Sequence, residues 1–190
     1  MNYYEIPTDT FDSLVTEAGL LLTSFDISKV GTQDAAYDND DILAATQGGI
    51  QISATPTFSD LGEDIDNCPV NMLELKHLDS WECTMSGTML TISLASVAKS
   101  LGAADADTTN KKVTLRNDLA TTDFTDIWWV GPLADGGCVA VKLSNALSTG
   151  GLSLQTGKAT KATSSFTFTG HYSIDAQDTV PMQVYVIPAA

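Results

Sequence analysis

The segment SSFTFTGHY, residues 164–172, is the clearest indication of the fold class of this chain. Its side chains alternate, so that one face carries Ser164, Phe166, Phe168 and Tyr172 and the other carries Ser165, Thr167, Thr169 and His171. A period of two is that of a β-strand, whose successive side chains point to opposite faces. Because one face is apolar and the other polar, we expect this strand to lie in an antiparallel sheet with one solvated face.

Strand-like segments of the same kind recur along the chain. They cover residues 19–27, 48–58, 80–93, 112–116, 124–130, 138–147, 152–155, 162–173 and 180–187. Turn-forming sequences separate them, such as GP at 131–132, DGG at 135–137 and GG at 150–151. Pro56 places the end of its strand at a sheet edge or a bulge, and Gly87 marks a turn or bulge.

Two segments show helical spacing. Leu94, Val97, Ala98 and Leu101 form an apolar stripe between a possible cap, Ser93, and a possible stop, Gly102. A shorter helix is predicted over residues 11–18. The sequence therefore predicts a mainly β protein, an antiparallel β-sandwich or barrel with one flanking α-helix over about residues 94–102.

Length and composition favour a single domain spanning residues 1–190. The chain is 43% hydrophobic and long enough to bury a core without disulfide bonds or a structural metal ion. We expect an N-terminal arm over about residues 1–17, a polar loop over residues 30–41 and a long loop over about residues 59–79. The acidic residues of the long loop, Asp60, Glu63, Asp64 and Asp66, lack the spacing of an EF-hand, so a solvated or subunit-contacting loop is the favoured interpretation over calcium.

The charge balance excludes some partners. Nine Lys and Arg against 24 Asp and Glu give a formal net charge of −15, which argues against specific nucleic-acid binding. We expect no export signal and no membrane segment. The three cysteines, Cys68, Cys83 and Cys138, are widely spaced and expected to be free thiols.

No motif for catalysis stands out. There is no G-x-S-x-G elbow, and only His77 and His171 are available as an imidazole base. The two histidines and three cysteines do not have the spacing of a zinc site. We therefore expect no enzymatic activity and no cofactor.

Trp128 and Trp129 are adjacent in a predicted strand and must point to opposite faces. One is expected in the core. The other lies either under a subunit interface or in ordinary second-layer packing, and the sequence leaves both open.

Several segments resemble a known family. DIWWVG (126–131), GGCVAVKLSNALSTGGLSLQT (136–156), FTFTGHY (166–172), QDTVPM (177–182) and LGAAD (101–105) resemble the major tail, or tail tube, proteins of long non-contractile-tailed phages and prophages of Gram-positive bacteria. The resemblance runs from about residue 18 to the C-terminus and rests on packing and turn motifs.

The resemblance implies a structural virion protein located in the tail, and in the host cytoplasm during assembly. Members of the family form hexameric rings that stack into a tube around the tape-measure protein and later conduct DNA. The implied partners are further copies of the chain, the tape-measure protein, the tail terminator and the distal tail or baseplate proteins, with DNA as transient cargo. The long loop becomes a candidate stacking element, and Thr167, Thr169 and His171 become candidate lumen residues.

Two other functions stay open at the sequence level. One is a monomeric Ig-like or carbohydrate-binding β-sandwich on a virion or cell surface, with Trp128 or Trp129 in the ligand patch. The other is an uncharacterised hydrolase using His171 or His77. The acidity itself fits either a lumen that does not adhere to DNA or simple solubility.

Overall fold

Eleven β-strands and one α-helix make up the described part of the chain. The structure, a computed structural model, describes residues 6–32 and 34–189. The strands are β1 (Leu20–Leu22), β2 (Ile42–Ala44), β3 (Thr46–Asp60), β4 (Lys76–Met89), β5 (Ala104–Asp107), β6 (Lys112–Leu115), β7 (Thr125–Pro132), β8 (Cys138–Ser148), β9 (Ser153–Gln155), β10 (Thr163–Thr169) and β11 (Met182–Ile187), and the helix is α1 (Leu94–Leu101). Short 3-10 turns lie at Thr8–Phe11, Ile27–Lys29, Asn39–Asp41, Leu73–Leu75 and Thr121–Asp123.

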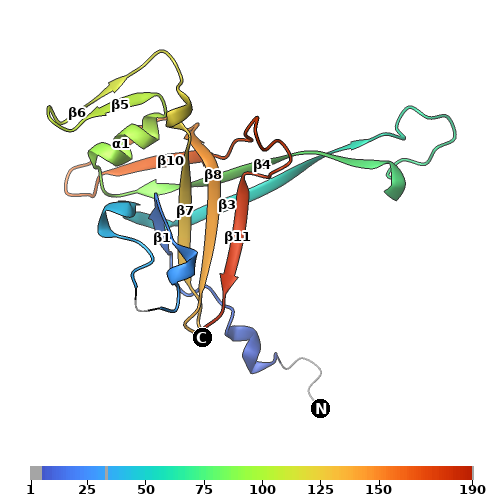
Figure 1. The fold of residues 1–190 in the computed structure, drawn as a ribbon, viewed down its shortest axis with the longest axis horizontal. Coiled ribbons are helices and arrows are strands. Elements are labelled where there is room, and N and C mark those ends of the chain that lie inside the picture. Colours follow the sequence, from blue (N-terminus) through green and yellow to red (C-terminus); the bar gives the residue numbers. More distant parts are fainter. Residues whose placement is uncertain (1–5, 33, 190) are drawn as a thin grey trace.

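The strands form two layers joined through β8 (Figure 1). One layer has the order β2-β1-β7-β8-β11, and the other has the order β3-β4-β10-β9. The far end of β8 pairs with β10, at Ser148 and Leu147, and so connects the layers. All pairings between these strands are antiparallel, which confirms the predicted mainly β, antiparallel class with a single flanking α-helix among the described residues.

The main core lies between the two layers. Phe166 and Phe168 of β10 are 2% and 1% exposed, and their ring centroids are 5.4 Å apart. Burying each ring is worth about 2–3 kcal/mol relative to leaving it in water. Residues from both layers surround them, namely Leu21, Leu43, Ala44, Cys83, Met85, Met89, Ile127, Val141, Leu143 and Ala146.

Gly87 has a different role from the predicted turn or bulge. It lies inside β4, where a Cβ atom would come within 3.0 Å of the Phe166 ring. The bulge occurs on the neighbouring strand, between Gln47 and Ile50, where Gly48 and Gly49 adopt positive φ angles of 79° and 80°. Glycine at position 87 thus makes room for an aromatic ring rather than for a turn.

The predicted helix over residues 94–102 is present as α1. Ser93 accepts a hydrogen bond from the Ser96 amide at its N-terminus, and Gly102 follows the last helical residue with φ 74°. Both ends therefore use the chemistry that the sequence predicted.

The predicted helix over residues 11–18 is wrong. The chain makes only the 3-10 turn at Thr8–Phe11 and then runs beside the β7–β8 turn, where the Ala134 amide donates to the Leu14 carbonyl. The strand predicted from residue 19 is also shorter, because it ends at Leu22. Residues 1–5 of the predicted N-terminal arm lie outside the described residues.

A second small hairpin, β5–β6, packs beside α1. Arg116, just after β6, forms ion pairs with Asp105, Asp118 and Asp123 and so ties the hairpin to the turn before β7. The sequence predicted β6 but not β5, since Ala-Asp-Ala-Asp has no apolar bulk to mark a strand.

Candidate assembly surfaces

The most conspicuous feature of the molecule is a hairpin that projects from its body (Figure 1). We call its outer part, residues 57–80, the hairpin arm. Its strands are the ends of β3 and β4, with pairs running from Thr57 and Ser80 out to Asp60 and Lys76. The predicted long loop over residues 59–79 is therefore too long, because its two ends are paired strand and only residues 61–75 form the connection.

The connection, which we call the tip loop (residues 61–75), is held by a small hydrogen-bond network. The Asp60 carboxylate accepts from the backbone amides of Gly62 at 3.0 Å and Asn71 at 2.6 Å. These bonds, first that from Asn71, lower the pKa of Asp60. The Asn71 side chain in turn accepts from Lys76 Nζ at 2.9 Å. The tip loop is thus an organised structure.

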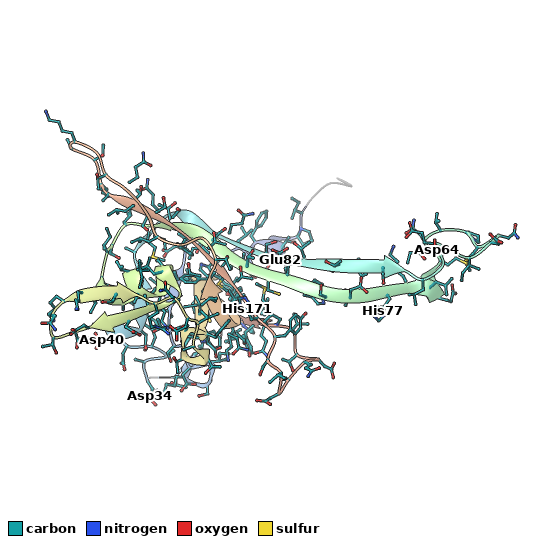
Figure 2. The ribbon with its side chains drawn as sticks, turned by 90° about the horizontal axis from the view of Figure 1, so that it is seen from above. Asp34, Asp40, Asp64, His77, Glu82 and His171 are labelled. Carbon is teal, nitrogen blue, oxygen red and sulfur yellow. The ribbon has the colours of Figure 1, made fainter. Side chains whose placement is uncertain are left out.

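The four acidic residues singled out in the sequence divide into two groups. Asp60 is turned inward to the amides of its own loop, whereas Glu63, Asp64 and Asp66 are exposed. Figure 2 shows Asp64 at the far end of the hairpin arm. Large apolar side chains are exposed beside them, with Leu61 at 63%, Ile65 at 54%, Val70 at 66% and Leu73 at 86%.

The outer edge of β3 is a second surface. In the described residues β3 pairs with β4 only, so one side of this 15-residue strand presents free backbone groups. Its sequence contains no charged residue before Asp60. Pro56 lies in this strand opposite Trp81, as its predicted place at a sheet edge requires.

A hydroxyl-rich face forms the outside of the β3-β4-β10 layer. The predicted lumen residues Thr167 and Thr169 lie opposite Ser86 and Thr84 of β4, which lie opposite Gln51 and Ser53 of β3. Thr149 and Thr169 are joined by a 2.9 Å hydrogen bond between their hydroxyls. Sequence reasoning found the β10 part of this face but missed its continuation, which the Ser and Thr alternation in residues 51–57 and 84–88 signalled.

His171 does not share that face. β10 ends at Thr169, and His171 packs edge-on against Phe124 with ring centroids 5.1 Å apart. Its Nδ1 lies 3.2 Å from the Asn145 carbonyl oxygen. The structure therefore separates His171 from Thr167 and Thr169, with which the sequence had grouped it. His77, by contrast, is exposed on the hairpin arm (Figure 2).

Trp128 and Trp129 point to opposite faces of β7, as predicted from their adjacency. Trp128 is 8% exposed and packs with Phe25 and Tyr185 beneath the segment that follows β1. Trp129 packs against the main core, and its Nε1 donates to the Ala18 carbonyl at 2.9 Å. Both indoles are thus held by contacts within the subunit.

The described residues hold no group of three or more His, Cys, Asp or Glu arranged to bind a metal ion. Among them, no helix has the length and apolar character needed to cross a membrane. The three cysteines are free thiols, and burial raises the pKa of Cys83 and of Cys138. A scan against models of known protein families and a search of curated proteins found no match to this chain.

Proposed function

We propose that this chain is a structural protein that polymerises with copies of itself, as a tail tube subunit of a long non-contractile-tailed phage does. The observation that carries the proposal is the open edge of β3. A long edge strand without charged residues pairs readily with another chain, whereas monomeric proteins usually block such edges with charges, prolines or bulges, or cover them. In β3 the bulge at Gly48–Gly49 and Pro56 leave residues 50–55 between them as an uninterrupted edge. Here the first charge is Asp60, at the end of the strand.

The hairpin arm supports the same function. Exposed apolar side chains such as Leu73 and Val70 cost solubility unless a partner covers them. The hairpin that carries these side chains projects well beyond the body of its own subunit (Figure 1). We propose that it contacts a subunit of the adjacent ring, with Glu63, Asp64 and Asp66 at this contact.

The hydroxyl-rich face supports a solvated lumen. Thr167 and Thr169 belong to a sheet face of small polar side chains, and the chain carries a formal net charge of −15. Such a wall offers a phosphate backbone no counterion release, so DNA would pass without adhering. In this proposal the tape-measure protein fills the lumen first, the tail terminator and the baseplate proteins close the two ends, and the protein resides in the virion tail.

The packing of the two tryptophans argues against the glycan-binding alternative. A carbohydrate site built on Trp128 or Trp129 needs an open indole face, whereas both rings are occupied by contacts within the subunit.

The edge of β3 provides the test. Thr55→Lys places a charge on the exposed edge strand, and Thr84→Lys places the same charge on the same sheet face of the interior strand β4. Sedimentation velocity and negative-stain electron microscopy should show that Thr55→Lys needs a higher protein concentration to form rings or tubes than Thr84→Lys does. Equal assembly of Thr55→Lys and the wild-type protein would mean that the edge of β3 takes no part.

A further inference from the structure

A small apolar hollow lies beside α1, at the end of the molecule away from the hairpin arm. It is lined by Ile92, Leu152 and Ser164, together with residues of α1 and the end of β4, and it is a shallow depression with room for about one water molecule. Ile92 is 50% exposed and Leu152 is 38% exposed, and Leu154 on β9 is 49% exposed. These side chains form an apolar patch that its own subunit leaves open.

The hollow also contains a polar group without a partner. Ser164 is 4% exposed, and its Oγ makes no hydrogen bond to any described residue. A buried hydroxyl that lacks a hydrogen bond costs about 1–3 kcal/mol. A single water molecule in the hollow suffices to remove this cost, so the docking surface is the apolar patch around the hollow and not its interior.

The charges around the hollow differ in sign from those of the rest of the molecule. Residues 136–174 contain no Asp or Glu, although the whole chain is strongly acidic. Of their three lysines, Lys142 is paired with Asp126 in the other layer, which leaves Lys158 and Lys161 on this side of the molecule. Lys158 and Lys161 are exposed in the turn between β9 and β10, the two strands that contribute Leu154 and Ser164. We call this turn, residues 156–162, the basic turn.

The tip loop has the complementary properties. Its 15 residues contain Glu63, Asp64, Asp66 and Glu74 and no Lys or Arg, and Leu73 is its most exposed apolar side chain at 86%. The tip loop and the basic turn lie at opposite ends of the long axis of the molecule, so they do not meet within one subunit (Figure 1).

We propose that the tip loop of one copy docks on the apolar patch and the basic turn of a second copy. An apolar side chain of the tip, with Leu73 the best placed, covers Ile92 and Leu152, while the tip carboxylates face Lys158 and Lys161. Because the two surfaces differ and lie at opposite ends, the contact is head-to-tail and can repeat without limit. This inference rests on the proposed self-assembly and names the surface that receives the hairpin arm.

Charge reversal tests the pairing. Lys158→Glu/Lys161→Glu should raise the concentration needed for assembly roughly tenfold or more, because it sets like charges against the tip. Glu63→Lys/Asp64→Lys/Asp66→Lys should do the same from the other side, because it changes the formal charge of the tip loop from −4 to +2. An equimolar mixture of the two variants should assemble again, since each tip then meets a patch of opposite charge in the other variant.

Two matched controls separate the contact from general effects. Lys111→Glu/Lys112→Glu changes the net charge by the same amount as the charge reversal in the basic turn, at exposed positions of the β5–β6 turn, and should assemble like the wild-type protein. Leu73→Ser should weaken assembly, whereas Leu115→Ser, at a position 66% exposed on β6, should not. All altered residues are exposed, so circular dichroism should show unchanged folding.

The outcomes distinguish this inference from the proposed function. If the wild-type protein forms no assemblies, the self-assembly itself is wrong, and this contact with it. If the wild-type protein assembles and the Lys158/Lys161 variant assembles equally well, or the control variant is equally impaired, only the pairing proposed here is overturned. Recovery in the mixture, with each variant deficient alone, is the result that supports it.

Discussion

The strands β3 and β4 run from the body into the hairpin arm, yet the two regions are stabilised differently. Within the body, Met85 and Cys83 of β4 are completely buried between the layers. Along the arm, Phe58 and Leu78 are 52% and 42% exposed. There the two strands are held together by the backbone pairing of β3 with β4 and by the hydrogen bonds of the tip loop. One hairpin thus supplies part of the core within the body and, in the function proposed above, a contact surface beyond it.

The largest contrast is expected in stability. Phe168→Ala removes a ring that is 1% exposed and should lower the free energy of unfolding by about 3–5 kcal/mol. Leu73→Ala on the arm, at 86% exposure, should change it by less than about 0.5 kcal/mol. Urea unfolding of both variants measures the difference. A destabilisation by Leu73→Ala as large as that by Phe168→Ala would show that the arm is part of the core.

A smaller contrast is expected in thiol reactivity. Cys83 is fully buried and its pKa is raised by burial, whereas Cys68 is half-buried in the tip loop. A maleimide reagent should therefore modify Cys68 at least about tenfold faster than Cys83 in the native protein. Peptide mapping after brief labelling identifies the order. Faster modification of Cys83 would contradict the packing of the body.

The smallest effect is expected at Asp60. Asp60→Asn weakens the bonds to the Gly62 and Asn71 amides, so these amides should exchange with solvent faster while core amides keep their rates. Because the folded pKa lies below the ordinary value of 3.8, the carboxylate stabilises the tip fully above that pH. The stabilisation is lost as the pH falls through the lowered pKa. Hydrogen exchange of the wild-type protein and the Asp60→Asn variant at matched pH should show faster exchange of these two amides in the variant only above the lowered pKa of Asp60.

The sequence predicted the elements that carry their own local signals. Ser93 and Gly102 bound α1 at the expected positions, and the alternation of residues 164–169 located β10 and its buried face. Residues 11–18 were wrongly predicted as a helix from four apolar residues at helical spacing. This weak local preference does not outweigh the backbone hydrogen bonds to the β7–β8 turn, which is far away in the sequence. The part of the arm from residue 59 to residue 79 was predicted as a loop because residues such as Leu78 gain their strand conformation from pairing, not from burial.

The candidate surfaces were harder to predict than the fold. Thr167 and Thr169 could be placed on a polar face from alternation alone, but the rest of that face depends on the register of β4 and β3. His171 was misplaced because β10 ends two residues earlier than its pattern. Pro56 indicated that β3 lies at a sheet edge. The hollow beside α1 could not be predicted, because its lining residues come from segments that are far apart in the sequence.

We propose that the purified chain assembles with itself through surfaces that its own core does not cover. Negative-stain electron microscopy of the wild-type protein across a range of concentrations and ionic strengths tests it most directly. We predict rings or tubes of constant diameter that become more abundant as the protein concentration rises. Monomers alone under all of these conditions, including in the presence of nucleating tail components, would contradict the claim.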